Sequence, residues 1–297
     1  MKKFIIGYFG DGPWSHGSIN KLLSDETLEI AFVCARSDKP DRILKETSLK
    51  NGIEFFSHPR VNSPEFLSQL ATFDCDLFVS MSYNQIFKKQ IIDLPKNGII
   101  NCHAGKLPFY RGRNILNWVL INGEKEFGIT THFVDEGIDT GDIILQRTYP
   151  IEDTDDYSTL LAKAYFKCPE ILYDSVKLIQ RGSFEVKRQI EIDPIGLYCV
   201  RRISGDEIID WNQSSRDVFN FVRALTTPGP RATTFLSRQA IFIDKVEMVP
   251  DARNFKGIPG AILSIERESF SVKTNDSFIR ILEWSGTSEL RVGDRLS

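Results

Sequence analysis

The chain has 297 residues, of which 41% are hydrophobic and 26% are charged, as is usual for a globular protein of one large domain or two smaller ones. Its formal net charge of −3 lacks the basic excess that grips many phosphates of a long nucleic acid. No apolar run approaches the ~20 residues that span a bilayer, so we expect no membrane segment.

The first 150 residues alternate between short apolar runs and amphipathic segments. Strands are expected at 3–9, 28–34, 53–56, 76–81, 99–101, 130–134 and 143–149, with helices at 18–23, 40–50 and 114–121 and a helix start at 63–65. The runs at 76–81 and 99–101 are apolar enough to be buried on both faces, as parallel strands are. The alternation predicts an open, mostly parallel α/β sheet.

The second half changes in composition. A helix is expected over 157–181, interrupted or kinked near Pro169, and a second amphipathic helix over 215–225. Short strands are then expected at 233–236, 240–249, 261–265, 270–274 and 279–284, which predicts a small β-barrel-like domain. We therefore divide the chain into a catalytic domain (1–183), a connector (184–204) and a small α+β or β-barrel-like domain (205–297).

The cysteines are odd in number and scattered, with no C-x-x-C pair. They are Cys34, Cys75, Cys102, Cys168 and Cys199. This usage is typical of reduced thiols rather than of a disulfide framework or a zinc site. We expect a cytoplasmic protein without a metal.

Two polar residues, Asn101 and His103, stand where an expected strand meets a loop punctuated by Pro108 and Gly112. Ligands of open α/β sheets bind beyond the carboxyl ends of the strands, which favours a site here. A single histidine at a strand end is also compatible with a purely structural role. If the strand continues, Cys102 points to the opposite face and fills the core.

An acidic segment, T-H-F-V-D-E-G-I-D-T-G-D at 131–142, lies between two expected strands. One interpretation is a solvated turn. A calcium loop fits poorly, because Gly137 takes a ligand position and Thr140 the place of the required glycine. A third interpretation places Asp139 opposite His103, where a carboxylate fixes the tautomer of an imidazole and stabilises its cation.

Three spaced blocks resemble the 10-formyltetrahydrofolate-dependent formyltransferases. They are N-C-H-A-G-K-L-P-F-Y-R-G-R, N-W-V-L-I-N-G-E and G-I-T-T-H-F-V-D-E-G-I-D-T-G-D-I-I. The family signature is Asn-x-His after a strand, a Leu-Pro-x-Tyr-Arg-Gly loop and an acidic loop ending in Asp-x-Gly. The likeness is close over about residues 75–150. It continues more weakly into I-S-G-D-E-I-I-D-W-N and V-R-A-L-T-T-P-G-P-R, which resemble the opening of the C-terminal domain of two-domain members.

The resemblance implies a formyltransferase fold and a catalytic trio of Asn101, His103 and Asp139. A primary amine attacks the formyl carbon of 10-formyltetrahydrofolate, and the asparagine amide stabilises the oxyanion that forms. The imidazole takes the proton of the amine, and the aspartate orients it. The formyl group is already activated, so neither ATP nor a metal is expected.

The resemblance also implies binding residues. For the folate they are Ser82, Tyr83, Ile86, Asp135 and Gly137. For the acceptor they are Lys106, Tyr110 and Arg111, with Arg201, Trp211, Asn212, Arg223 and Arg231 as candidates for a diphosphate clamp and a base platform. Arginine contacts phosphate with charge assistance and an aromatic ring can stack on a base, but Trp211 and Arg223 are equally compatible with structural roles.

Several branches of the family differ in the amine that they formylate. Glycinamide formyltransferases need only the first domain, so the second domain expected here argues against that branch. Formyltetrahydrofolate hydrolases usually carry an N-terminal regulatory domain, whereas the first strand expected here begins at residue 3. The residues Arg113, Asn117 and Trp118 after the Tyr-Arg-Gly loop are typical of the branch that formylates amino sugars on dTDP, UDP or GDP for bacterial surface polysaccharides. The sequence favours this acceptor. Methionyl-tRNA is the alternative, a non-catalytic folate or nucleotide sensor is a third interpretation, and a homodimer is plausible.

Overall fold

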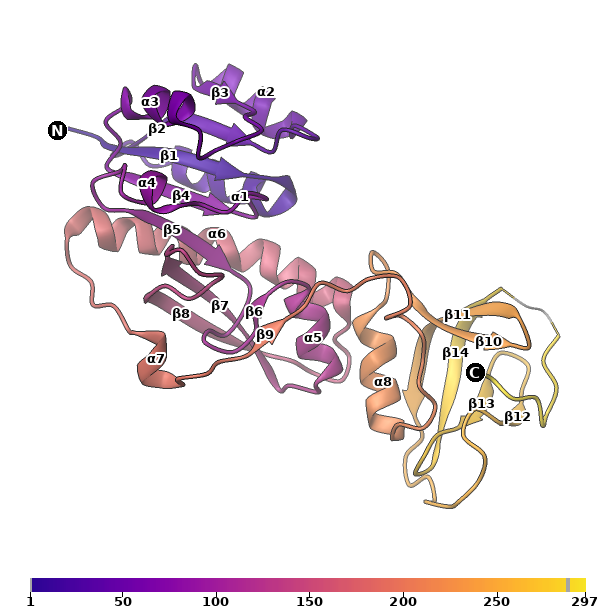
Figure 1. Cartoon of the computed structure of the whole chain (residues 1–297). Coiled ribbons are helices and arrows are strands. Elements are labelled where there is room, and N and C mark those ends of the chain that lie inside the picture. Colours follow the sequence, from indigo (N-terminus) through magenta and orange to yellow (C-terminus); the bar gives the residue numbers. More distant parts are fainter. Residues whose placement is uncertain (1, 287–288) are drawn as a thin grey trace. The chain divides into compact units, whose positions relative to one another are not determined.

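The computed structural model describes residues 2–286 and 289–297, which form two compact units (Figure 1). Unit 1 consists of Met1–Gly112, Phe127–Tyr149 and Ala162–Tyr198, and unit 2 of Arg113–Glu126, Pro150–Leu161 and Cys199–Ser297. Each unit thus takes its residues from three segments of the chain. The expected domain boundaries at 183 and 204 stay a prediction.

Unit 1 is built on a seven-stranded sheet with the order β3-β2-β1-β4-β5-β7-β8. The strands are β1 (Phe4–Gly10), β2 (Leu28–Ala35), β3 (Glu54–Phe56), β4 (Leu77–Met81), β5 (Ile99–His103), β7 (Glu126–Phe133) and β8 (Ile143–Pro150). The strand pairs from β3 to β5 are parallel, and β7 pairs antiparallel with β5. The mostly parallel α/β sheet expected from the sequence is confirmed.

The helices of unit 1 begin and end at recognisable signals. They are α1 (Gly12–Leu23), α2 (Arg42–Lys50), α3 (Pro64–Ala71), α4 (Lys89–Ile92), α6 (Tyr157–Arg181) and α7 (Gln189–Ile192). The Ser63 hydroxyl accepts from the backbone N–H of Phe66 and caps α3, as its sequence predicts. Helix α6 runs along the sheet (Figure 1), where Ser175 lies 2.5 Å from the hydroxyl of Thr131 on β7. It is one element with Pro169 inside it, so the helix is not interrupted there, and the alternative of a kink at Pro169 stays a prediction.

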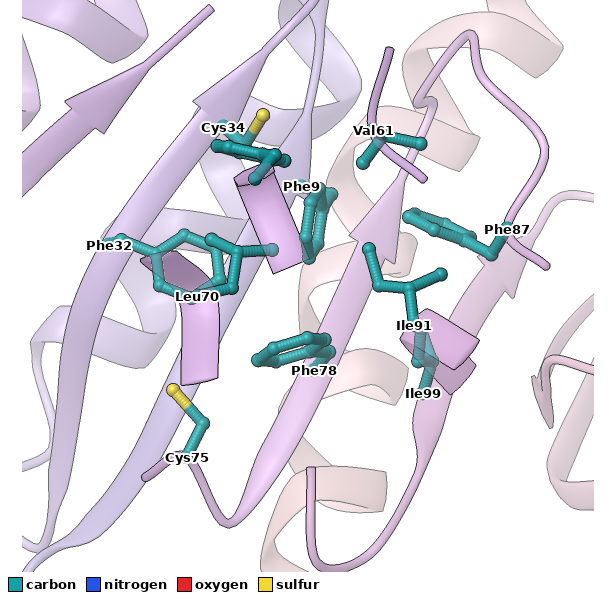
Figure 2. Packing of buried hydrophobic residues seen from close by; sticks show 11 residues of the cluster. Phe9, Phe32, Cys34, Val61, Leu70, Cys75, Phe78, Phe87, Ile91 and Ile99 are labelled. Atoms are coloured by element: carbon teal, nitrogen blue, oxygen red, sulfur yellow. The ribbon is translucent and has the colours of Figure 1, made fainter. Parts of the chain in front are cut away.

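One hydrophobic cluster of unit 1 is rich in aromatic rings (Figure 2). Phe9 of β1 contacts Phe32 of β2, Phe78 of β4 and Phe87 edge to face, with ring centroids 5.1–5.5 Å apart. Edge-to-face pairs contribute about 0.5–1.5 kcal/mol each beyond the burial of their area. The cluster therefore stabilises the packing of β1, β2 and β4 against one another.

Unit 2 contains a five-stranded antiparallel sheet with the order β10-β11-β14-β13-β12. The strands are β10 (Ala232–Leu236), β11 (Gln239–Met248), β12 (Ile262–Ile265), β13 (Phe270–Lys273) and β14 (Phe278–Ser285). Arg295 and Leu296 bridge to Ala261 beside β12 and to Leu236 of β10, so the last residues tie both edges of the sheet. This arrangement confirms the expected β-barrel-like domain, and removing open edges is what barrels achieve.

Helix α5 (Ile115–Ile121) of unit 2 packs on helix α8 (Ser215–Ala224) of the same unit. Two strands of two residues each, β6 (Arg111–Gly112) and β9 (Tyr198–Cys199), were not expected from the sequence. They are too short to produce an alternating pattern. Among the described residues, no helix is long and apolar enough to cross a membrane.

Candidate active site

The three predicted catalytic residues meet in unit 1 at the carboxyl end of β5. Asn101 and His103 lie on β5, and Asp139 lies in the loop between β7 and β8. Asp139 Oδ2 is 3.6 Å from His103 Nδ1, and its Oδ1 is 3.5 Å from Nε2 of a second histidine, His132 of β7. The Asn101 side chain is 3.3 Å from the same His132 nitrogen. The carboxylate therefore lies between two imidazoles.

The proton positions on His103 follow from its partners. His103 Nε2 lies 2.7 Å from the backbone carbonyl oxygen of Tyr110. A carbonyl oxygen only accepts, so Nε2 carries the proton and Nδ1 of the neutral ring is the basic nitrogen. That basic nitrogen faces Asp139. A proton taken up there would lie between the ring and the Asp139 carboxylate.

His132 orients Asn101 by the same logic. His132 Nδ1 lies 2.7 Å from the carbonyl oxygen of Phe133, so it donates there and Nε2 accepts in the neutral ring. In the neutral ring Nε2 then accepts a hydrogen bond from Asn101, so the atom of the Asn101 amide that faces His132 is its nitrogen. One N–H of Asn101 is used in this way, and the other is available to a developing oxyanion.

Asp139 is held in a backbone conformation that few side chains adopt. Its φ is 54°, in the left-handed region, and its Oδ2 accepts from the backbone N–H of Gly112 at 2.9 Å. Burial alone would raise the pKa of Asp139. When the two rings are protonated, the charge of His103 and the charge and hydrogen bond of His132, together with the backbone N–H of Gly112, outweigh burial, so the pKa of this carboxyl lies well below its usual value.

Gly105 shows how tightly the loop after β5 closes on the histidine. A Cβ at this position would lie 2.5 Å from His103 Nε2 and 2.6 Å from the carbonyl oxygen of Tyr110. A side chain there would force the imidazole of His103 or the carbonyl of Tyr110 to move. Cys102, between Asn101 and His103 of β5, is buried with its sulfur 3.8 Å from the carbonyl oxygen of Cys168, in the core as expected.

The predicted folate residues lie in two loops of unit 1. Ser82 is exposed, with a φ of 60°, and Ile86 is 63% exposed. Tyr83 packs its ring against Phe9 and Phe87 of the aromatic cluster. In the acidic loop Asp135 accepts from the backbone N–H of Gly137, a contact that shapes the turn.

The acceptor residues predicted in unit 1 are mostly buried. Lys106 is partly buried and Tyr110 is buried, with its carbonyl oxygen on His103. Arg111 is 7% exposed, and its guanidinium donates twice to the side-chain oxygen of Gln189. The structure therefore gives Arg111 a partner within the protein.

Of the acceptor residues predicted in unit 2, three have partners within the unit and two are exposed. Trp211 is buried and donates to the hydroxyl of Thr234, Arg223 is buried and donates to the carbonyl oxygens of Glu152 and Asp155, and Arg231 pairs with Asp244. Arg201 and Asn212 are exposed. The contacts of Trp211, Arg223 and Arg231 hold unit 2 together, and their use in binding an acceptor stays a prediction.

Two residues of this site had no role in the sequence analysis. His132 stands in the quoted acidic segment, directly opposite Asn101 in the β5–β7 register. The antiparallel pairing of the two strands was the signal that could have found it. Gln189 belongs to the expected connector, and no pattern marks it. Among the described residues, no cluster of His, Cys, Asp and Glu could hold a metal ion.

The profile of the formyl transferase family matches residues 2–176, and that of the formyl transferase C-terminal domain matches residues 203–291. The chain belongs to the formyl transferase family. The enzyme class expected from the motifs, a folate-dependent formyltransferase, is confirmed.

Relatives in this family match the formyltransferase over nearly its whole length. Methionyl-tRNA formyltransferase of Caldanaerobacter subterraneus subsp. tengcongensis is 34% identical over 98% of this chain and 94% of its own. The enzyme of that name from Thermodesulfovibrio yellowstonii is 32% identical over 95% of this chain and 91% of its own.

Solved structures share the fold of this formyltransferase. An N-formyltransferase from Helicobacter canadensis, in complex with folinic acid and dTDP-3-aminofucose, aligns with a TM-score of 0.71 at 20% identity and covers 96% of this chain and 100% of its own. HypX from Aquifex aeolicus, in complex with tetrahydrofolic acid, aligns with a TM-score of 0.63 at 18% identity over 97% of this chain and 45% of its own. At these identities the likeness shows the fold alone.

Proposed function

We propose that this formyltransferase moves a formyl group from 10-formyltetrahydrofolate to a primary amine, with Asn101, His103 and Asp139 at the reacting atoms. The observation that carries the proposal is the position of Asp139 against the basic nitrogen of His103, beside the Asn101 amide. These are the three groups that formyl transfer to an amine needs, namely an oxyanion donor, a base and a group that stabilises the protonated base.

The amine nitrogen attacks the formyl carbon, and the carbonyl oxygen becomes an oxyanion that accepts from the second N–H of Asn101. His103 Nδ1 takes the proton that the amine loses, and Asp139 stabilises the resulting imidazolium. Collapse of the tetrahedral intermediate breaks the bond to the folate nitrogen. That nitrogen gains the proton that His103 took from the amine, which restores the neutral ring, and tetrahydrofolate leaves with the formyl group now on the amine.

The folate assignment is supported by the ligands of the structural neighbours, which are folinic acid and tetrahydrofolic acid. We assign the folate to the two loops that carry Ser82, Tyr83 and Ile86 and Asp135 and Gly137. The exposed apolar side chain of Ile86 and the backbone groups of the acidic loop suit a flat pterin ring, whereas Tyr83 contributes mainly through the packing of its segment.

For the acceptor, the relatives favour methionyl-tRNA. Curated relatives at 34% and 32% identity, which span both family domains of this chain, carry that acceptor in their name. This support is stronger than the support for a sugar nucleotide, which the names of the structural neighbours give at only 20% identity.

A nucleotide-linked amino sugar is the second candidate, and charge is the observation that favours it. Unit 2 holds more Asp and Glu than Lys and Arg, and several of its arginines are paired within the protein. A transfer RNA is gripped through many phosphates and needs a basic surface, whereas one diphosphate needs only a few cations. The Arg113, Asn117 and Trp118 pattern after the Tyr-Arg-Gly loop points the same way.

One assay separates the two acceptors. The enzyme is incubated with 10-formyltetrahydrofolate, initiator methionyl-tRNA and a panel of dTDP-, UDP- and GDP-linked amino sugars, and each product is weighed by mass spectrometry. Formylation of methionyl-tRNA that weakens steeply with added salt is the expected result. Transfer only to a sugar nucleotide overturns the first acceptor and establishes the second. Folate binding without transfer to any amine overturns both and supports the sensor interpretation.

A further inference from the structure

A single glutamine side chain joins the connector to both loops of the active site. Gln189, the first residue of α7, is 2% exposed although it comes from a segment with exposed apolar side chains such as Ile190 and Ile195. Its Oε1 accepts from Arg111 Nε at 3.0 Å and Nη2 at 2.8 Å. Its Nε2 donates to the backbone carbonyl oxygens of Asp139 at 2.8 Å and Gly141 at 2.7 Å.

The chemistry of these partners admits one amide orientation. A guanidinium only donates and a carbonyl oxygen only accepts, so the four contacts require an acceptor on one side and a donor on the other. A glutamate could accept from Arg111 but could not donate to the two carbonyls. A lysine could donate but could not accept. Among side chains of this length only glutamine satisfies both loops.

The two loops that Gln189 joins are the ones that place Asp139. One contact holds the backbone of Asp139 itself, which keeps a left-handed φ of 54°. Another holds Arg111, whose neighbour Gly112 donates its N–H to Asp139 Oδ2. Residues kept in sparsely populated backbone regions need such surrounding contacts to stay there.

The connector approaches Arg111 at a second point. Gly196 has a φ of 69°, and a Cβ there would lie 2.8 Å from Arg111 Nη1. Arg111 Nη1 also donates to the carbonyl oxygen of Ile195 at 3.4 Å. The arginine is therefore enclosed by the connector, and no acceptor phosphate is needed to explain its burial.

We propose that Gln189 is a positioning residue, which sets the carboxylate of Asp139 against His103 by tying its loop to Arg111. The inference rests on the proposed formyl transfer and deepens it. It gives the connector a part in catalysis, and it assigns Arg111 to the support of the active site.

The test replaces Gln189 and follows both turnover and structure. Gln189→Ala and the isosteric Gln189→Glu are compared with Glu191→Ala, which removes an exposed side chain from the same short helix. The readouts are kcat and KM for folate and acceptor, the unfolding midpoint, and the side-chain ¹⁵N resonances of His103 and His132. The resonances report the environment of Asp139 without any turnover.

We expect kcat to fall about 10–100-fold in both Gln189 variants, since a catalytic group displaced by ~1 Å can cost that much. Both KM values should stay within about twofold, because uniform binding is untouched. The resonances of both histidines should move in the Gln189 variants and stay in Glu191→Ala.

Three outcomes overturn the proposal. They are an unchanged kcat in folded Gln189 variants, a loss confined to KM, and unmoved histidine resonances. If Gln189→Ala does not fold, the kcat, the KM values and the histidine resonances of Gln189→Glu test the proposal. If Gln189→Glu folds but is inactive for another reason, its histidine resonances test the proposal without turnover. An unaltered chain that transfers formyl to no amine refutes the proposed function, while the resonances still show whether Gln189 positions Asp139.

Discussion

The polar groups around Asp139 in unit 1 and the basic residues of unit 2 use their hydrogen bonds differently. In unit 1 backbone carbonyls take one N–H of each histidine, and the other nitrogen of each ring faces Asp139. In unit 2 the guanidinium of Arg223 donates hydrogen bonds to backbone carbonyl oxygens of its own unit. The polar groups of unit 1 thus converge on one carboxylate, whereas the donors of Arg223 serve the structure of its own unit.

The first prediction breaks the unit 1 side of this comparison. Replacing Asn101 by Ala removes the donor to the oxyanion, so kcat should fall about 10²–10³-fold, or about 2.7–4 kcal/mol. The KM for folate should change little, since the donor acts mainly in the transition state. Steady-state kinetics check this. Asn97→Ala, an exposed amide in the turn before β5, is the control that should keep full activity. An Asn101→Ala variant within about twofold of full activity would remove this residue from the mechanism.

The second prediction breaks the unit 2 side. Arg223→Ala leaves the carbonyl oxygens of Glu152 and Asp155 without their donor, so the free energy of unfolding should fall by about 2–3 kcal/mol. Urea titration measures this loss, and kcat per folded molecule should hold. A stable variant with a raised acceptor KM would instead place Arg223 at the acceptor, as the sequence predicted.

The third prediction sharpens the role of His132. In His132→Phe the ring volume is largely kept, but Asn101 loses its acceptor and Asp139 loses one imidazole. We expect kcat to fall about tenfold, or 1.4 kcal/mol, because the amide is then free to rotate. The rate measurement is paired with folate binding, which should be unchanged. A loss of folate affinity in place of kcat would assign His132 to binding.

The smallest effect concerns pH. The pKa of Asp139 is lowered in the folded chain, so its ionisation stabilises the fold above the unfolded value of 3.8 and the contribution is lost as pH falls below it. The unfolding free energy of the unaltered chain should therefore exceed that of Asp139→Asn by more at pH 7 than at pH 3. Urea titrations at the two pH values check this. An equal difference at both would mean that Asp139 has no depressed pKa.

Much of the fold could be predicted because its signals are local. Each of these signals spans only a few neighbouring residues. They are the apolar runs of β4 and β5, the cap at Ser63 and the alternating pattern of the unit 2 strands. The family resemblance marked Asn101, His103 and Asp139, whereas the residues alone left a solvated turn and a pairing with His103 open for the acidic loop. The structure brings the three side chains together, and their catalytic role stays a prediction. The burial of Trp211 and Arg223 depends on contacts with distant segments, which composition does not reveal.

The support of the site could not be predicted for the same reason. Gln189 contacts Arg111 and Asp139 from 78 and 50 residues away along the chain, and one glutamine in a connector produces no pattern. His132 could be predicted only in part. The pairing of β5 and β7 brings it opposite Asn101, but the register of that pairing is needed to tell which face of the sheet it occupies.

A single-turnover measurement of formyl transfer, made on the unaltered chain, His103→Ala and the control His58→Ala, bears most directly on the assignment of the base. Each enzyme is mixed with 10-formyltetrahydrofolate and the acceptor that the unaltered chain formylates. The His58 imidazole stacks on Phe66 of α3 and should be dispensable. We predict a loss of about 10²–10⁴-fold in the His103→Ala transfer step with folate binding retained, and no loss in the control. Equal transfer rates in all three would contradict His103 as the group that takes the proton of the amine.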